Sequence, residues 1–250
     1  GPGEFLSPAG MGWRGDTLWV MDVAQSRLSW FHRGEHVRTE RFIPVQRRRG
    51  ERTAAQWPMA DGSWFSYFTK GFQHPSGHPE NHFPIVRTAA DGDSERMVAA
   101  LQESFPFRVT LHHSEGTSRL APFMSDFPLQ SMGDLGTRMA IVDRPFGAVD
   151  EASVRVTVIE ASGDTVLSRE YGVEAVPLTD GQWDERLREA LAGVDLPNRP
   201  YGFREVDAAL PRPEHWPSTT RVIMGRDHSV WLALADLPGR AEREWAVLDE

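Results

Sequence analysis

A turn-and-strand unit near the start of the chain limits the possible folds more than any other feature. A Gly15-Asp16 turn leads into a short apolar strand that ends at Asp22. Arg27 opens a second alternating strand, and a turn containing Gly34 closes it. Short strands separated by Gly and Asp turns are typical of antiparallel hairpins. The unit therefore predicts consecutive antiparallel strands.

The start of this unit recurs along the chain. The clearest copies are Asp16-Thr17-Leu18-Trp19, Asp61-Gly62-Ser63-Trp64-Phe65 and Asp227-His228-Ser229-Val230-Trp231, with a weaker copy over 133–143. The first two copies lie 45 residues apart, which matches a four-stranded propeller blade of about 40–50 residues. We therefore predict an all-β chain with blades starting near 16, 61, 105, 134 and 227, in a six-bladed β-propeller that is truncated in residues 1–250.

Hairpins and one helix complete the expected elements. Residues 154–160 and 165–170 alternate in hydropathy around a Ser162-Gly163-Asp164 turn, and a similar pair, 85–87 and 97–101, flanks residues 91–93. Apolar residues at helical spacing predict a short amphipathic helix near 182–193, capped by Thr179 or Asp180. Because Pro-rich stretches flank this helix, we expect an insertion between blades.

The repeat pattern resembles the NHL-type repeat and the bacterial six-bladed β-propeller proteins of the TolB-like group. The resemblance is most specific over residues 1–44 and moderate over 219–250. It implies one propeller domain over residues 1–250, as a fragment of a longer, exported bacterial protein that is periplasmic or secreted. The resembled proteins include binding modules, lyases and lactone or ester hydrolases, because an architecture of this kind hosts many functions.

Composition excludes some classes of function. The chain has 27 Lys and Arg against 36 Asp and Glu, a formal net charge of −9, which argues against general nucleic-acid binding. Cysteine is absent, so the chain has no disulfides and no thiolate metal site. No apolar run reaches the roughly 18 residues of a membrane span, and no signal segment opens the sequence.

Three histidines are the candidate metal ligands. His74, His78 and His82 are spaced by four residues, which on a helix would align three imidazoles for Zn²⁺ or a similar ion. Pro75 and Pro79 forbid that helix. A loop could hold the ion with Glu80 as a fourth ligand, but a solvated connection between strands explains the same residues.

Other candidates have structural explanations. His112-His113 lies at a strand end and lacks any accompanying nucleophile motif. Asp22, Asp143 and Asp249 close apolar runs, so they could form an acidic ring, although pairing with Arg or with turn backbone explains them better. The tryptophans at repeat positions, Trp19, Trp64 and Trp231, are expected to pack between blades.

The sequence therefore predicts a non-catalytic binding or scaffold module that presents a ring face to a protein or a small ligand and needs no cofactor. A propeller enzyme with its site over the central channel is the alternative, and a divalent metal ion at the three histidines would favour it. RNA binding through the basic segment Arg41–Arg52 is a second alternative.

Overall fold

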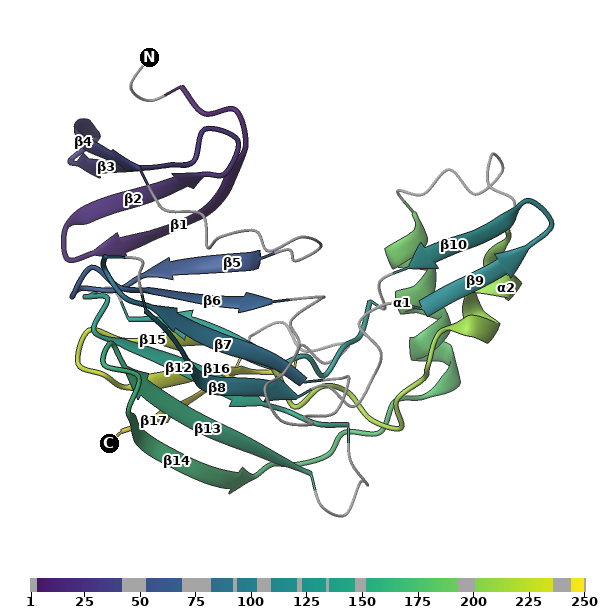
Figure 1. Ribbon diagram of the computed structural model, residues 1–250. Helices are drawn as coiled ribbons and strands as arrows, with labels where there is room; N and C mark the ends of the chain where they lie inside the picture. Colours follow the sequence, from purple (N-terminus) through teal and green to yellow (C-terminus); the bar gives the residue numbers. More distant parts are fainter. Residues whose placement is uncertain are drawn as a thin grey trace.

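The computed structural model describes residues 4–41, 53–68, 82–91, 94–102, 109–120, 123–133, 135–146, 152–192, 201–235 and 244–249. Over these residues the chain consists of antiparallel sheets and two helices (Figure 1). No described helix is long and apolar enough to cross a membrane.

Four sheets follow one another along the sequence, and we call them blades 1 to 4. Blade 1 contains β1 (Pro8–Arg14), β2 (Thr17–Asp22), β3 (Arg27–His32) and β4 (Glu35–Arg41). Blade 2 contains β5 (Thr53–Pro58), β6 (Trp64–Phe68), β7 (His82–Thr88) and β8 (Glu95–Gln102). Blade 3 contains β11 (Leu129–Met132), β12 (Arg138–Asp143), β13 (Ser153–Glu160) and β14 (Thr165–Gly172). Blade 4 contains β15 (Thr219–Met224), β16 (Val230–Leu234) and β17 (Trp245–Leu248).

The first strands of the blades lie innermost, as in a propeller. β1 contacts β5, and β11 contacts β15. The turns that follow these strands meet at one end of the molecule. The Arg14 Nη2 donates to the Met59 carbonyl at 2.9 Å, the Ala60 N–H to the Gly136 carbonyl at 2.7 Å, and the Arg226 Nη2 to the Gly15 carbonyl at 3.0 Å. Blade 4 is thereby joined to blade 1, and the β-propeller architecture is confirmed.

The repeated Asp builds the same turn in two blades. In blade 2 the Asp61 Oδ1 accepts from the N–H and the hydroxyl of Ser63, at 2.9 and 2.6 Å. In blade 4 the Asp227 Oδ1 accepts from the same two groups of Ser229, at 3.1 and 2.6 Å. Such Asx-type bonds satisfy backbone groups that the sheet leaves unpaired. The sequence repeat therefore reports turn chemistry.

Blades 2 and 3 each pack their two faces against different neighbours. Phe65 and Ile85 of blade 2 are fully buried against Met139 and Ile159 of blade 3. The opposite face of blade 3, which carries Val156, packs against blade 4 in a separate core. Because strand side chains alternate between faces, a blade between two others needs apolar residues on both of its faces.

Gly12 allows one close contact inside blade 1. A Cβ at this position would lie 2.7 Å from the Trp19 ring, a distance that no side chain tolerates. The missing side chain lets the indole lie flat on β1, where Trp19 is 3% exposed. Trp30 beside it lies under the guanidinium of Arg14, 4.6 Å from the ring centroid, which adds a cation–π contact to the burial.

The insertion is larger than the sequence predicts. The expected helix is α1 (Asp180–Leu191), and Thr179 caps it through reciprocal bonds with Gln182. A second helix, α2 (Phe203–Ala209), lies in the Pro-rich stretch after it. The strands β9 (Val109–His113) and β10 (Gly116–Leu120) form a two-stranded hairpin that contacts α2. We call these elements the helical lobe; it extends away from the blades in Figure 1.

Two predictions about blades are wrong. The blade expected near 105 is the hairpin of the helical lobe instead, because Leu111 on β9 joins the core of Trp183, Leu187 and Tyr201 from the helical segments. The described residues consequently form four blades rather than six. The expected hairpins β7–β8 and β13–β14 are confirmed.

The tryptophan prediction holds in part. Trp19 is buried between blades, and Trp64 packs against the same cluster. Trp231 is 41% exposed, because it lies on the face of blade 4 that points away from blade 3, where no described residue forms a further sheet. Its register neighbours Ile223 and Val247 are 43% and 46% exposed, so blade 4 carries an open apolar row.

Asp22 fixes the entry into blade 1. Its carboxylate is buried and accepts from the backbone N–H groups of Leu6, Ser7, Ala24 and Gln25, at 2.8 to 3.3 Å. Burial acts to raise the pKa of Asp22, but the four donors outweigh it and hold the pKa below its usual value. The structure thus assigns Asp22 to turn backbone rather than to an acidic ring.

We predict that Asp22→Asn destabilises the chain at neutral pH, because an amide accepts fewer bonds at this position. A depressed carboxyl pKa contributes stability above the unfolded-state value of about 3.9, and this contribution disappears as the pH falls through the lower folded-state pKa. Urea unfolding from pH 7 to pH 3 will show the difference between wild type and variant narrowing with acidification. A difference that does not depend on pH would contradict this assignment.

Candidate functional site

The groove on blade 1

The open face of blade 1 carries the main candidate site. The register aligns Trp13, Leu18 and Phe31 in one row across β1, β2 and β3. Trp13 is 54% exposed. The opposite face carries Trp19 and Trp30 and is buried, so the alternation of β2 divides its apolar residues between a core and an open surface.

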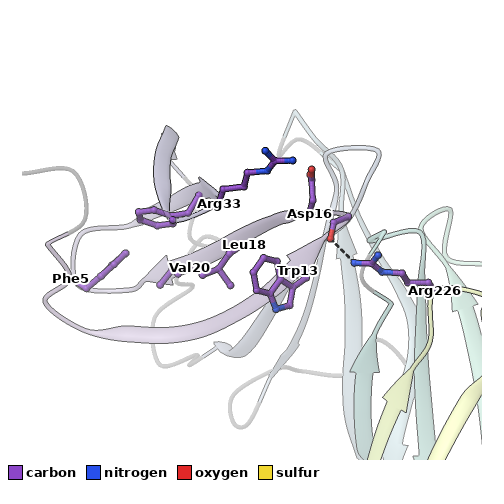
Figure 2. A pocket seen from close by; sticks show the side chains of 10 residues that line it. Phe5, Trp13, Asp16, Leu18, Val20, Arg33 and Arg226 are labelled. Carbon is purple, nitrogen blue, oxygen red and sulfur yellow. Dashed lines mark hydrogen bonds between the residues drawn. The ribbon is translucent and has the colours of Figure 1, made fainter.

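These side chains line a groove of about 760 Å³, which we call the blade 1 groove. Its walls are formed by Phe5, Trp13, Gly15, Asp16, Leu18, Val20, Phe31, Arg33, Gly34 and Arg226. Figure 2 shows the apolar side chains along the strands, with Arg33, Asp16 and Arg226 gathered at the turn end. The volume lies within the roughly 300–1,000 Å³ of small-molecule sites.

Aromatic contacts shape the far end of the groove. The rings of Phe5 and Phe31 lie 6.0 Å apart between centroids, tilted by 57°. The guanidinium of Arg27 lies over the Phe5 ring, with its Cζ 5.7 Å from the ring centroid. Phe31 also meets the His36 ring edge-on at 5.6 Å. These contacts hold the apolar wall in place without filling the groove.

The turn end of the groove is polar and carries more positive than negative charge. Arg33 has a φ of +50°, which places it at the tip of the β3–β4 turn. Arg226 reaches across from blade 4 and donates to the Gly15 carbonyl. The Asp16 carboxylate lies 3.3 Å from the Nδ1 of His32, which ends β3 of the same blade. An anionic group fits best at this end, while an apolar body lies along the strands.

The charged end of blade 3

A second polar site lies where β12 ends. Asp143 is mostly buried opposite Arg155 in the register, and its Oδ1 has no hydrogen-bond partner among the described residues. Burial raises the pKa of Asp143 to about 6, although the charge of Arg155 partly opposes the shift. A carboxyl with such a pKa can exchange a proton near neutral pH.

The next residue ties blade 3 to blade 4. The Arg144 Nη1 donates to the Thr219 carbonyl at 2.7 Å, and its other nitrogens contact the Phe127 carbonyl at 3.4 Å. Burial lowers the pKa of Arg144 to about 10, and the charge of Asp126 opposes this shift. Arg144 is thus a structural cation at a blade junction.

Fate of the predicted site residues

The candidate metal ligands fall largely outside the described residues. His74 and His78 lie there, and His82 is the first residue of β7, with only its backbone described. Within the described ranges, no group of three His, Asp or Glu side chains is arranged to hold a metal ion. The three-histidine site stays a prediction.

The remaining candidates do not come together. His113 lies in the helical lobe, where its Nε2 is 3.0 Å from the Ser118 hydroxyl and its ring lies 5.8 Å from Tyr201. Of the basic segment, Arg41 ends β4 and residues 42–52 lie outside the described ranges.

Sequence reasoning missed the blade 1 groove. One signal was available: Leu18 to Met21 is an uninterrupted apolar run, which is typical of a strand with apolar residues on both faces. No local pattern could have placed Arg226 at the groove, because 211 positions separate it from Gly15.

Comparison with known proteins

Sequence comparison finds no match to a protein-family model and none to a curated protein. Among solved structures, a luciferin-regenerating enzyme aligns over 99% of this chain and 92% of its own, with 9% identity and a TM-score of 0.29. A streptogramin B lyase aligns over 91% and 90%, with 11% identity and a TM-score of 0.25. A calcium-binding protein, regucalcin from Agrobacterium tumefaciens strain C58, aligns over 96% and 86%, with 9% identity and a TM-score of 0.22. Likeness at these TM-scores assigns no activity to the chain.

We predict that Asp143→Asn stabilises the chain at pH 8, because the wild type must bury a charge there that Asn does not carry. A carboxyl pKa raised from 3.8 to about 6 in the folded state lowers stability above pH 6, by about 3 kcal/mol on the scale of 1.36 kcal/mol per pKa unit. The wild type recovers this stability as the pH falls from 6 to about 4. Urea unfolding at pH 8, 6 and 4 measures how the difference in unfolding free energy between the variant and the wild type changes with pH. A variant that is less stable than the wild type at pH 8 would refute the prediction.

Proposed function

We propose that this chain is a non-catalytic binding module whose blade 1 groove takes an amphipathic, anionic ligand. The observation that carries the proposal is the groove itself. Its apolar wall, which includes the exposed Trp13 and the half-buried Phe31, ends at two arginines from different blades. Apolar walls supply affinity, and a few placed charges supply orientation.

The arrangement of the cations supports an anionic end group. Arg33 comes from the β3–β4 turn and Arg226 from the β15–β16 turn, and both line the same groove. A guanidinium binds carboxylate and sulfonate-like groups through charge-assisted hydrogen bonds. The ligand would therefore bridge blade 1 and blade 4 at the turn end.

A propeller enzyme is the second candidate, and Asp143 is the observation in its favour. Its raised pKa and unbonded Oδ1 suit a general acid or base. RNA binding through Arg41–Arg52 gains no support from the described residues. The extracytoplasmic location and the single-domain organisation are further proposals that rest on the sequence resemblance.

A pair of matched fluorescent probes tests the groove. Anilinonaphthalene sulfonate carries an apolar body and an anionic end, and N-phenylnaphthylamine has the same kind of body without the charge. We expect Trp13→Ala to weaken the binding of both probes. Arg33→Asn is chosen because Asn tolerates the positive φ at this position. It should weaken the binding of the sulfonate probe by about tenfold, equivalent to about 1.4 kcal/mol, and leave the binding of the neutral probe unchanged.

Val37→Ala is the matched control, because Val37 is an exposed apolar residue of β4 outside the groove, 57% exposed. Fluorescence titration at low salt gives the affinities. If Arg33→Asn weakened the binding of both probes equally, the proposal that the ligand is anionic would be refuted. Unchanged binding in Trp13→Ala would remove the groove as the site.

The metal alternative has a direct measurement. If His74, His78 and His82 hold an ion, the purified chain will contain about one equivalent of a divalent metal by elemental analysis. The triple variant with Ala at these positions will then lose it. A metal-free chain that also fails to take up Zn²⁺ in a titration would exclude the site and weaken the enzyme alternative.

A further inference from the structure

A second cavity lies between the turns of blade 3 and blade 4. It has a volume of about 390 Å³, and we call it the blade 3–4 pocket. Its walls include Leu135 from the β11–β12 turn, Arg138 of β12, Glu160 and Ser162 from the β13–β14 turn, and His228 from the β15–β16 turn. None of these residues lines the blade 1 groove. The volume is within the range of small-molecule sites.

The backbone of His228 has a conformation that favours glycine. Its φ is +70°, which lies in the left-handed region. The equivalent residue of blade 2 is Gly62, with a φ of +83°. Each of the two lies between the Asp and the Ser whose mutual hydrogen bonds close the turn. Glycine therefore serves the turn without strain, and strained residues of other types concentrate at binding sites.

The side chain of His228 adds an independent observation. Its Nε2 is buried and has no hydrogen-bond partner among the residues that the structure describes. A buried polar atom without a partner costs free energy, which a bond from a ligand or a water recovers. Because His228 lines the blade 3–4 pocket, a molecule bound there can supply this bond.

Two other groups of the pocket can only accept hydrogen bonds. The side chain of Glu160 is 41% exposed, and an ionised carboxylate has no donor. One of its oxygens, Oε1, accepts from the Arg138 Nη2 at 3.2 Å. The Ser162 hydroxyl donates to the Asp164 carboxylate at 3.0 Å, so the Ser162 oxygen is left as an acceptor. A ligand group that matches these oxygens is therefore a donor.

The number of acceptors and the apolar wall narrow the class of ligand. A primary ammonium group carries three N–H donors on one atom, and the pocket offers His228, Glu160 and Ser162 as acceptors. Because Arg138 already compensates the charge of Glu160, N–H donation rather than net charge selects the ligand. Leu135 is 43% exposed and gives an alkyl chain an apolar surface to contact.

We propose that the blade 3–4 pocket binds a small primary alkylamine, whose ammonium group donates to the His228 Nε2, the Glu160 carboxylate and the Ser162 hydroxyl oxygen. His228 then acts as a neutral imidazole that carries its proton on Nδ1. The pocket shares no lining residue with the blade 1 groove, and its ligand has the opposite charge. This proposal is therefore tested separately from the proposed function.

Three probes with matched alkyl chains test the wild-type chain. n-Butylammonium has three N–H donors, butyltrimethylammonium has the same charge without a donor, and butyrate is an anion. The ¹⁵N signals of the histidine rings are followed at pH 8, where imidazole groups are ordinarily neutral; the signals absent from His228→Gly belong to His228. We expect n-butylammonium to shift the Nε2 signal with saturation and to bind about tenfold more tightly than either other probe. Equal binding of the two cations, tighter binding of butyrate, or no saturable shift overturns the proposal.

Variants then assign the contacts by titration calorimetry. His228→Gly relieves the strained backbone, so we expect it to lose n-butylammonium binding at equal or higher thermal stability. Glu160→Gln keeps the size of the side chain without its charge and should weaken binding by about tenfold. His112→Asn is the matched control, because His112 is exposed on β9 of the helical lobe, and it should bind as the wild type does. Wild-type affinity in either His228→Gly or Glu160→Gln would show that the amine binds elsewhere and would refute the assignment.

Discussion

The packing of one sheet face on the next holds this molecule together. Blades 2 and 3 bury alternating residues against a neighbour on each face, so that in blade 2 Phe65 faces blade 3 while Trp64 faces blade 1. Side chains alternate between the two faces of each strand, so an apolar face is either covered by another sheet or exposed to water. The arrangement of blades follows from this requirement, and so does the presence of open faces where the described sheets end.

The open faces explain where the candidate surfaces lie. The blade 1 groove is the face that would meet a preceding sheet, and the row of Ile223, Trp231 and Val247 is the face that would meet a following one. Both are apolar for the same reason that the buried faces are. In the groove, Arg33 and Arg226 from two different blades gather at one end of the apolar wall. An apolar wall that ends in two cations suits a ligand with an apolar body and an anionic end.

Burial has opposite outcomes for the pKa values of two aspartates, Asp22 in blade 1 and Asp143 in blade 3. Asp22 keeps its charge because four backbone N–H groups surround it. Asp143 occupies the same place after an apolar strand, but no described backbone N–H donates to its Oδ1, and burial raises its pKa. The sequence pattern of an apolar run followed by Asp is identical in both cases. The backbone donors around the strand end therefore set the carboxyl pKa, and they hold the charge on Asp22.

Local sequence is enough to specify the turns, the strand faces and the helix start. Turn residues such as Asp61 and Ser63 fix the hairpins, the alternation of Val154, Val156 and Val158 fixes a strand face, and Thr179 with Gln182 fixes a helix start, because each depends on neighbours within a few residues. The blade count, the helical lobe and the groove depend on contacts between residues that are distant in the sequence. Leu111 joins the core of α1 rather than a blade, and Arg226 reaches Gly15 across 211 positions. Such choices depend on which apolar faces meet in space, and no local pattern encodes the partner of a face.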